Sequence, residues 1–337
     1  MTPVPLDLPL RPSEAAELAH LVFDLAESKP LAEEVRSRIA ARGAVLRLET
    51  VTPWFGSLER DPVHPSSYYL AVDGAAGEPL LLHMAVAAAP TSSVFFKPLL
   101  IGRMRRPNGP EIILNTVPFG PAEQERLAQF AGRIDSAFLP RPHGSRVAVT
   151  MESRDPEKEL PAAFEAFRAV WKRTGKNIAA VAVPPGTGAR RFYYAALWAA
   201  IRAGWREGYC AGVTISSKEE ARDAAMFSKL TVAVNPGPSS LEAAARLHEA
   251  VRVARSSLKT GRSFDLEIAF DGAVSPGQLE FCLDWLRERG HAAQLVSAAA
   301  NTGTDLAAAA RRYQCGLNAP ATSHVEAIAE IAERLLG

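Results

Sequence analysis

The sequence predicts an α/β protein in which an α+β module over residues 1–108 precedes a (β/α)8 barrel of the TIM type over residues 109–337. Short apolar runs alternate with helical stretches eight times after residue 110, and repeated βα units of this kind form parallel strands. Eight such units, with no Gly-x-Gly-x-x-Gly motif after the first run, favour a closed barrel over an open sheet. The length of 337 residues also suits a barrel of roughly 250 residues and a module of about 100.

The N-terminal module is expected to begin with two helices, over residues 12–28 and 30–42. Four strand-like runs follow with no long helix between them, so we expect an antiparallel sheet. These runs are residues 45–51, 68–72, 79–84 and 93–96. The turn residues Pro107–Pro110 mark the end of the module.

Each of the eight later units pairs one strand with the helix after it. The expected pairs are 112–117 with 121–133, 146–151 with 157–174, 177–183 with 188–206, 209–215 with 217–227, 230–235 with 239–257, 264–270 with 276–289, 292–296 with 303–313, and 315–318 with 322–336. Gly175 and Gly290 follow helices with basic last turns, a pattern typical of helix C-caps.

Composition narrows the class of protein. Hydrophobic residues make up 47% of the chain, charged residues 22%, and the formal net charge is +1, so the sequence predicts a large core and no nucleic-acid partner. No apolar run reaches the roughly 18 residues of a membrane span. The N-terminus lacks signal-peptide features, and the odd number of cysteines, without a CxxC pair, is typical of reduced thiols. We therefore expect a cytoplasmic protein. A homo-oligomer is compatible with the sequence, which does not fix the oligomeric state.

The run Phe264–Asp271 is the most informative segment, because it carries carboxylates where a buried strand is normally apolar. Side chains alternate across a strand, so Glu267 and Asp271 share one face and Leu266 and Ile268 share the other. In a closed barrel the apolar face packs under helices and the acidic face points inward. A buried carboxylate without a partner costs several kcal/mol. The two carboxylates therefore indicate a role in chemistry more than a role in stability.

Function in such barrels lies at the C-terminal ends of the strands. There we expect Glu267 as the principal catalytic residue, with Glu152 as a second carboxylate and Asp271 as a third. The side chains expected to bind substrate are Asn115, Arg154, Thr214, Asn235, Asn301 and Asn318. The asparagines suit sugar hydroxyls, and an arginine suits bidentate pairing with a substrate carboxylate.

The sequence leaves the cofactor open. It contains no HxH, HExxH or Cys/His spacing of a metal site. Glu152, Glu267 and Asp271 offer oxygen ligands of the kind that Mg²⁺ and Mn²⁺ prefer. A divalent cation such as Mn²⁺, Mg²⁺ or Zn²⁺ is therefore the candidate cofactor, with its ligands unassigned.

Two segments resemble bacterial tagaturonate epimerases, a family of TIM-barrel sugar-acid epimerases. Cys210–Pro236 is similar to the family's strand that ends in Ala-Asp-Ala-Asp-His and continues through a helix into Phe-Thr-Ile-Asp-Pro. Phe264–Asp271 is similar to the family's strand Phe-Glu-Val-Ser-Val-Asp-Glu. The likeness continues through Ser275-Pro and Leu286–Gly290.

The resemblance implies a metal-assisted sugar-acid epimerase or isomerase, in which a base moves a proton, or a retro-aldol step opens the carbon skeleton, while a metal polarises oxygens. Glu267 and Asp271 match acidic positions of the family. Asn235 stands where the family has Asp, and Ser216 or Ser217 stands where it has a strand-end His, a metal ligand. The family's His-Ser-Gly-Ser-Asp-Lys segment has no counterpart. Much of the family's ligand set is therefore unmatched.

Three readings of function follow from these residues. The first is an epimerase or isomerase of a carbohydrate or sugar acid, with a small-molecule carbohydrate as its partner. The second is a non-catalytic sugar-binding or regulatory barrel that has lost the metal site. The third is a structural or assembly role, in which aromatic residues of the N-terminal sheet form an interface. The default alternative is that these aromatic residues pack in the core.

Overall fold

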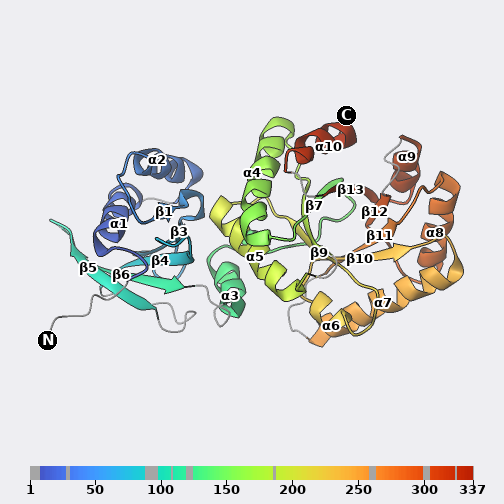
Figure 1. Cartoon of the computed structure of the whole chain (residues 1–337), viewed down its shortest axis with the longest axis horizontal. Helices are drawn as coiled ribbons and strands as arrows, with labels where there is room; N and C mark the ends of the chain where they lie inside the picture. The colour runs from blue at the N-terminus through green and yellow to red at the C-terminus, as the bar shows by residue number, and fades with distance from the viewer. Residues whose placement is uncertain are drawn as a thin grey trace. The chain divides into compact units, whose positions relative to one another are not determined.

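The computed structural model describes residues 8–27, 31–87, 98–107, 109–118, 124–184, 187–257, 263–298, 304–322 and 325–336. The chain forms two compact units (Figure 1). The first unit comprises Met1–Phe138 with Ala200–Arg206, and the second comprises Leu139–Ala199 with Glu207–Gly337.

The first unit is built on a six-stranded antiparallel sheet. Five of its strands follow the order β1-β3-β4-β6-β5, and the sixth, β2, pairs with β3. Its strands are β1 (Thr52–Pro53), β2 (Glu59–Arg60), β3 (Ser67–Asp73), β4 (Pro79–Val86), β5 (Leu99–Arg105) and β6 (Glu111–Pro118). Its helices are α1 (Pro12–Ala26), α2 (Glu33–Gly43), the short 3₁₀ turns η1 (Phe55–Ser57) and η2 (Ser136–Phe138), and α3 (Gln124–Ile134). Helix α1 buries Ala15, Leu18, Val22 and Ala26, a spacing of three and four residues that places one apolar stripe on the sheet.

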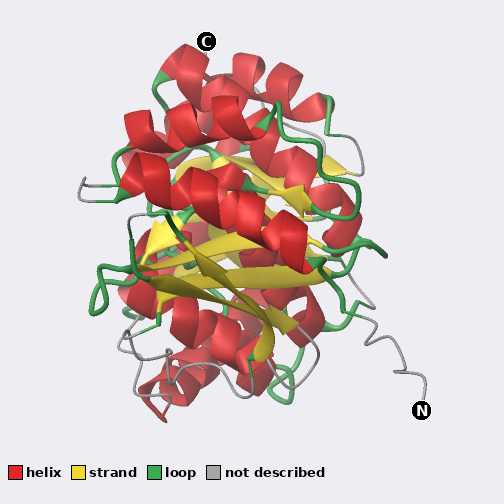
Figure 2. Cartoon of the chain, turned by 90° about the vertical axis from the view of Figure 1, so that its left-hand side faces the viewer, coloured by secondary structure: helices red, strands yellow, loops and turns green. Residues whose placement is uncertain are grey.

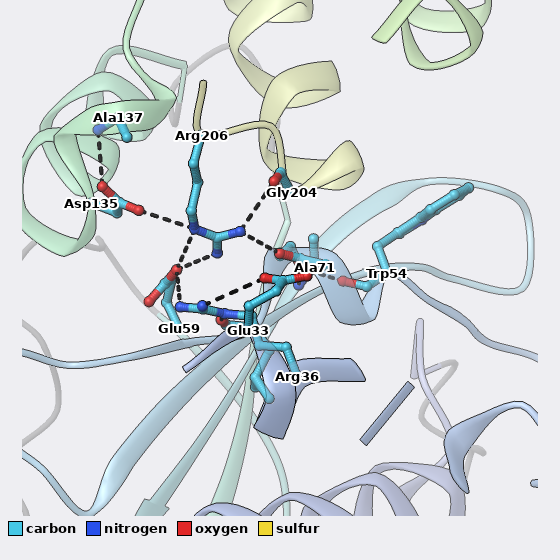
Figure 3. Close-up of polar contacts among 12 residues, drawn as sticks. Glu33, Arg36, Trp54, Glu59, Ala71, Asp135, Ala137, Gly204 and Arg206 are labelled. Atoms are coloured by element: carbon cyan, nitrogen blue, oxygen red, sulfur yellow. Dashed lines mark hydrogen bonds and ion pairs between the residues drawn. The ribbon is translucent and has the colours of Figure 1, made fainter. Parts of the chain in front are cut away.

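A group of buried and half-buried charges joins four segments of the first unit (Figure 3). Glu59 of β2 accepts hydrogen bonds from Arg36 of α2, at 2.8 Å, and from Arg206, whose Nε lies 3.0 Å from the same oxygen. Arg206 also donates to Asp135, at 3.1 Å, and to the Gly56 carbonyl, at 3.0 Å. Burial raises the pKa of Glu59, and the two guanidinium groups oppose that rise. This cluster fixes α2, β2 and residues 200–206 to one another.

The second unit is a closed barrel of parallel strands with helices around it. Figure 2 colours the helices of the chain red and its strands yellow. Its strands are β7 (Ala148–Glu152), β8 (Ala179–Val183), β9 (Cys210–Thr214), β10 (Lys229–Val234), β11 (Asp265–Phe270), β12 (Leu295–Ala298) and β13 (Gly316–Thr322). Its helices are α4 (Pro156–Thr174), α5 (Ala189–Ala203), α6 (Ala221–Ala224), α7 (Pro238–Ser257), α8 (Pro276–Glu288), α9 (Thr304–Arg312) and α10 (Ala327–Leu336). The end of α5, from Ala200, belongs to the first unit. The strands pair in sequence order, and β13 closes the barrel on β7, with Asn318 opposite Ala148.

The predicted fold class, a βα barrel with an N-terminal α+β module, is confirmed, and the closed barrel has seven strands where we expected eight. The run 112–117, expected to open the barrel, lies instead in β6, where Leu114 is opposite Met84 of β4. Only residues 106–110 connect β5 to β6, and such a short connection favours antiparallel pairing with the strand just before it. Parallel pairing needs a long crossover connection, which is absent between β5 and β6, so the two strands pair as an antiparallel hairpin.

The structure also decides several smaller expectations. Residues 45–51 are not a strand, and the run 93–96 lies outside the described residues. Gly175 caps α4 with φ of 68°, and Gly290 follows α8 with φ of 78°, so both predicted C-caps are confirmed. The three cysteines are buried and free. Among the described helices, none combines the length and the apolar character needed to cross a bilayer.

Candidate functional site

A cavity of about 260 Å³ lies inside the barrel, and all seven strands contribute to its lining. The polar residues of the lining are Thr150, Glu152, Thr214, Lys229, Thr231, Glu267, Asp271, Ser297 and Asn318. Nearer the strand starts the interior is apolar, with Ala148, Ala180, Cys210 and Leu295 packed together. Branched apolar side chains usually fill this space in barrels of this type. The upper interior here is polar and hollow.

An ion pair lies at the base of this cavity. The Lys229 ammonium of β10 donates to the Glu267 carboxylate of β11, with Nζ 2.5 Å from Oε2. Both side chains are almost fully buried, at 1% and 2% exposure. The Thr231 hydroxyl donates to the same oxygen at 2.8 Å. A buried charge is tolerated when it is paired and hydrogen-bonded, and Glu267 satisfies both conditions.

Two neutral residues extend the ion pair into a closed ring of hydrogen bonds. Asn318 of β13 donates from Nδ2 to Glu267 Oε1 at 2.5 Å, and the Thr150 hydroxyl of β7 donates to Asn318 Oδ1 at 2.8 Å. The ring closes where Lys229 donates to Thr150 Oγ1 at 3.2 Å. Four strands that are distant in sequence are therefore linked by one polar network. Such connected polar networks hold side chains in a single arrangement.

Gly212 makes space for the lysine. It is opposite Lys229 in the pairing of β9 with β10, and a Cβ at this position would lie 2.5 Å from Lys229 Cε. Real Cβ contacts do not come this close. The glycine in β9 is thus explained by the long side chain that crosses the barrel beside it.

The two inward glutamates have opposite pKa shifts. Burial alone raises the pKa of Glu267, but the Lys229 charge and the donors Lys229, Asn318 and Thr231 outweigh it, so the pKa is lowered and Glu267 is a carboxylate. Burial raises the pKa of Glu152, and the Glu267 charge adds to this rise against the opposing effect of Lys229. Two carboxyl groups with diverging pKa values in one cavity are typical of acid–base sites.

Glu152 is the more available of the two for proton transfer. It is half-buried at the end of β7, and no described residue is its hydrogen-bond partner. Asp271 follows β11 and is exposed at the cavity rim. In the ring of seven strands β7 and β11 are three positions apart, the largest separation that such a ring allows. The carboxyl groups of Glu152 and Asp271 therefore approach the cavity from opposite sides.

These residues do not fit a divalent cation. Both oxygens of Glu267 already accept hydrogen bonds, and the Lys229 ammonium beside them would repel a metal ion. Within the described ranges, no three His, Cys, Asp or Glu side chains are grouped as metal ligands. The Lys229 ammonium is instead the positive charge of the site.

The structure brings five of the nine predicted site residues to this cavity. They are Glu152, Thr214, Glu267, Asp271 and Asn318. Asn301 lies outside the described residues. The remaining three residues are elsewhere, each for a physical reason.

Asn115 belongs to β6 of the first unit, where its Nδ2 lies 3.4 Å from His83 Nδ1, because its strand pairs in the antiparallel sheet. Asn235 is exposed beyond the end of β10, where its backbone N–H donates to Ser240 Oγ at 3.0 Å. Arg154 is exposed, since the chain leaves β7 at Glu152 and turns toward α4, with Ser153 donating to Glu159 at 2.6 Å. Neither Asn235 nor Arg154 lines the cavity, contrary to expectation.

Lys229 was missed from the sequence, because the expected strand began at Leu230 and left the lysine in the preceding loop. The available signal was the alternation of the strand itself. Extending it by one residue places Lys229 on the same face as Thr231 and Ala233. A lysine on an inward face, beside a strand carrying an inward glutamate, indicates a buried ion pair.

No family model matches the chain, and no curated protein does either. Solved structures of fructuronate-tagaturonate epimerase UxaE from Cohnella laeviribosi are similar in fold. The glycerol-bound form has a TM-score of 0.52 at 14% identity and covers 86% of this chain and 75% of that chain. The native form has a TM-score of 0.51 at 12% identity, with the same coverage. The resemblance to this family suggested by the sequence is thereby confirmed as a remote likeness of fold.

Proposed function

We propose that this chain is a barrel enzyme that epimerises a sugar acid or a related carbohydrate by proton transfer at a carbon next to a carbonyl or carboxylate group. One observation carries the proposal: a cavity in the barrel holds a buried lysine–glutamate pair and a second carboxyl group with a raised pKa. A purely structural interior would be filled and apolar. The fold it shares with a fructuronate-tagaturonate epimerase supports epimerisation of a sugar acid.

The two available carboxyl groups account for inversion at carbon. One of Glu152 and Asp271 takes the C–H proton, and the other delivers a proton to the opposite face; their roles exchange in the reverse direction. Placement on strands three apart in the ring supports this assignment. A carboxyl group with a raised pKa, such as that of Glu152, is a better proton donor and acceptor near neutral pH.

Lys229 supplies the charge that such a step needs. Removal of the proton leaves an electron pair that moves onto the carbonyl oxygen, and a fixed ammonium stabilises the resulting negative charge. Two of the three N–H groups of Lys229 donate hydrogen bonds to Glu267 and Thr150. Among the described residues, none accepts a hydrogen bond from the third. Glu267 is then a positioning residue, because it holds the lysine charged and in place.

A second candidate is a sugar-binding barrel without turnover. One observation favours it: hydrogen bonds occupy both oxygens of Glu267, the most deeply buried carboxylate of the cavity, so proton transfer would depend on the two outer carboxyl groups alone. The two candidates predict the same binding and differ in whether solvent protons enter the sugar.

Deuterium incorporation tests the proposal. The protein is incubated in D2O with fructuronate, tagaturonate, glucuronate and galacturonate, and exchange at carbon is followed by NMR. We expect exchange with at least one of them, and a loss of about 10²-fold or more in Glu152→Gln and in Asp271→Asn. Glu157→Gln, an exposed glutamate on α4 paired with Arg191, makes the same chemical change outside the cavity and should exchange at the wild-type rate.

The outcomes separate the candidates. Exchange that persists in EDTA and depends on Glu152 supports a metal-independent epimerase. A rise in melting temperature with a sugar acid, but without exchange, supports the binding barrel and contradicts the enzyme. Exchange that disappears in EDTA and returns with Mn²⁺ would contradict the role given to Lys229.

A further inference from the structure

A second and larger cavity adjoins the first in the barrel unit. It has a volume of about 510 Å³ and lies where β8 and β9 end and α5 and α6 begin. Thr214, at the end of β9, lines both cavities. A volume of 510 Å³ is within the range of about 300–1,000 Å³ that is typical of ligand pockets. The proposed proton transfer uses only the first cavity and leaves the second without a role.

The lining of the second cavity disfavours negatively charged ligand groups. Its lining combines the apolar side chains of Val183, Pro184, Val213 and Ala224 with the neutral hydroxyl groups of Thr187, Thr214 and Ser216. The acidic residues Glu220 and Asp223 lie at its exposed edge, and Glu220 is held by the Ser216 N–H at 2.8 Å. The described lining contains no lysine, arginine or histidine. An anionic group would meet carboxylates there without a compensating cation, whereas a neutral apolar group would bury its surface.

The first cavity has the opposite character. It presents hydroxyl, amide and carboxyl groups and the Lys229 ammonium, which suit a polyhydroxylated acid. A ligand that spans both cavities therefore has a polar head on one side of Thr214 and an apolar substituent on the other.

The geometry points to a substrate that is a sugar acid carrying a neutral apolar substituent, such as an O-aryl or O-alkyl group, and not a free monosaccharide. This inference rests on the proposed function and names its substrate class. The head lies over Lys229 and between Glu152 and Asp271, and the substituent lies between the ends of β8 and β9. Thr214 is the boundary between the two subsites.

The test compares methyl and phenyl glycosides of the same sugar acid, glucuronic or galacturonic acid, by titration calorimetry. Burial of the larger apolar group should make the phenyl derivative bind about tenfold or more tightly than the methyl derivative. Ala189 lines the second cavity and is only partly buried at the start of α5. Ala189→Trp should fill the cavity and weaken phenyl binding far more than methyl binding, so that the phenyl preference is lost. Ala162→Trp, at an exposed position of α4, is the matched control and should keep the preference.

Each outcome has one meaning. Equal binding of the two derivatives by the wild-type protein, or a phenyl preference that survives Ala189→Trp, overturns the inference. Deuterium exchange into the methyl derivative in that case shows that the proposed function still stands. If neither derivative nor any free sugar acid binds or exchanges, the proposed function fails as well. Ala189→Leu, a smaller side chain, should lower the phenyl preference by an intermediate factor and covers the case in which the tryptophan variant does not fold.

Discussion

The Lys229–Glu267 pair shows how a single contact couples stability to a site. Burying two charges costs more than their attraction returns unless hydrogen bonds satisfy the remaining atoms, and here Thr231, Asn318 and Thr150 supply those bonds. Stability alone does not explain the pair, because two apolar side chains of the same volume stabilise a folded protein as much or more. Its position in the lining of a cavity is what the proposed active site would require.

Removing one member of this pair should be costly. Lys229→Met leaves the Glu267 carboxylate buried without its cation, and we expect a loss of about 3–5 kcal/mol in the free energy of unfolding. The double variant Lys229→Met with Glu267→Gln should recover a large part of that loss, because no unpaired charge remains. Urea unfolding of the two single variants and the double variant measures the coupling. Strictly additive losses would show that the two side chains do not interact.

For a single residue, the sequence predicts which face of a strand the side chain lies on, because side chains alternate along a strand. The inward direction of Glu267 follows from the alternation of β11, whose neighbours Leu266 and Ile268 are buried on the other face. Its partners do not follow, because Asn318 lies 51 residues away and Lys229 lies 38 residues away. Hydrogen bonds across a barrel depend on register and rotamer, neither of which a single sequence contains.

At the scale of elements, the cluster around Glu59 fixes α2, β2 and residues 200–206 to one another through shared guanidinium contacts. Glu59→Gln keeps the shape but leaves Arg36 and Arg206 without this carboxylate. We expect a loss of about 2–3 kcal/mol in the free energy of unfolding, because hydrogen bonds to buried charged groups are of that size.

Glu33→Gln is the matched control for this prediction, since Glu33 also pairs with Arg36, but at 3.9 Å with a side chain that is 81% exposed. An exposed pair of this kind contributes little, so no more than about 0.5 kcal/mol should be lost. Chemical unfolding of both variants decides the matter. Equal losses would mean that burial does not set the strength of these pairs.

The elements that the sequence predicts well are those with a strong local signal. The C-cap of α4 is an example, because Gly175 alone adopts the left-handed conformation there. The run 112–117 is the contrary case. Its residues are equally suited to a barrel strand and to an antiparallel strand, and the choice is made by β4 and β5 on either side of it. Tertiary partners decided this element, not its own composition.

At the scale of the whole molecule, three histidines make both units sensitive to acid. Burial lowers the pKa of His83 in the first unit, and of His143 and His248 in the second, to about 4 in each case. Below pH 6.5 the unfolded chain binds protons at these positions and the folded chain does not, so the free energy of unfolding falls as the pH falls from 6.5 toward 4. Carboxyl groups with raised pKa values, such as Asp265, act in the opposite direction near the lower end of this range.

A single variant isolates the histidine effect. His248→Gln removes one titrating group, so its free energy of unfolding should fall less steeply than that of the wild type between pH 6.5 and pH 5. Urea unfolding at three pH values in this window measures both slopes. A slope that is the same in the two proteins would show that His248 takes up its proton equally in the folded and unfolded chain.

The architecture of the whole chain was the easiest level to predict, because repeated βα units and a change of period at the module boundary are visible in the residues themselves. The ion pair at the base of the cavity was not, since Lys229 precedes the apolar part of its strand. The central claim is therefore about placement: a sugar acid binds inside the barrel against Lys229 and between two carboxyl groups.

A crystal structure of the protein soaked with a sugar acid that raises its melting temperature tests this most directly. The predicted result is density inside the barrel, with an oxygen of the ligand within hydrogen-bond distance of Lys229 Nζ and a ligand carbon between the carboxyl groups of Glu152 and Asp271. Density for the sugar at another place, with only water against Lys229, would contradict the assignment of this cavity as the active site.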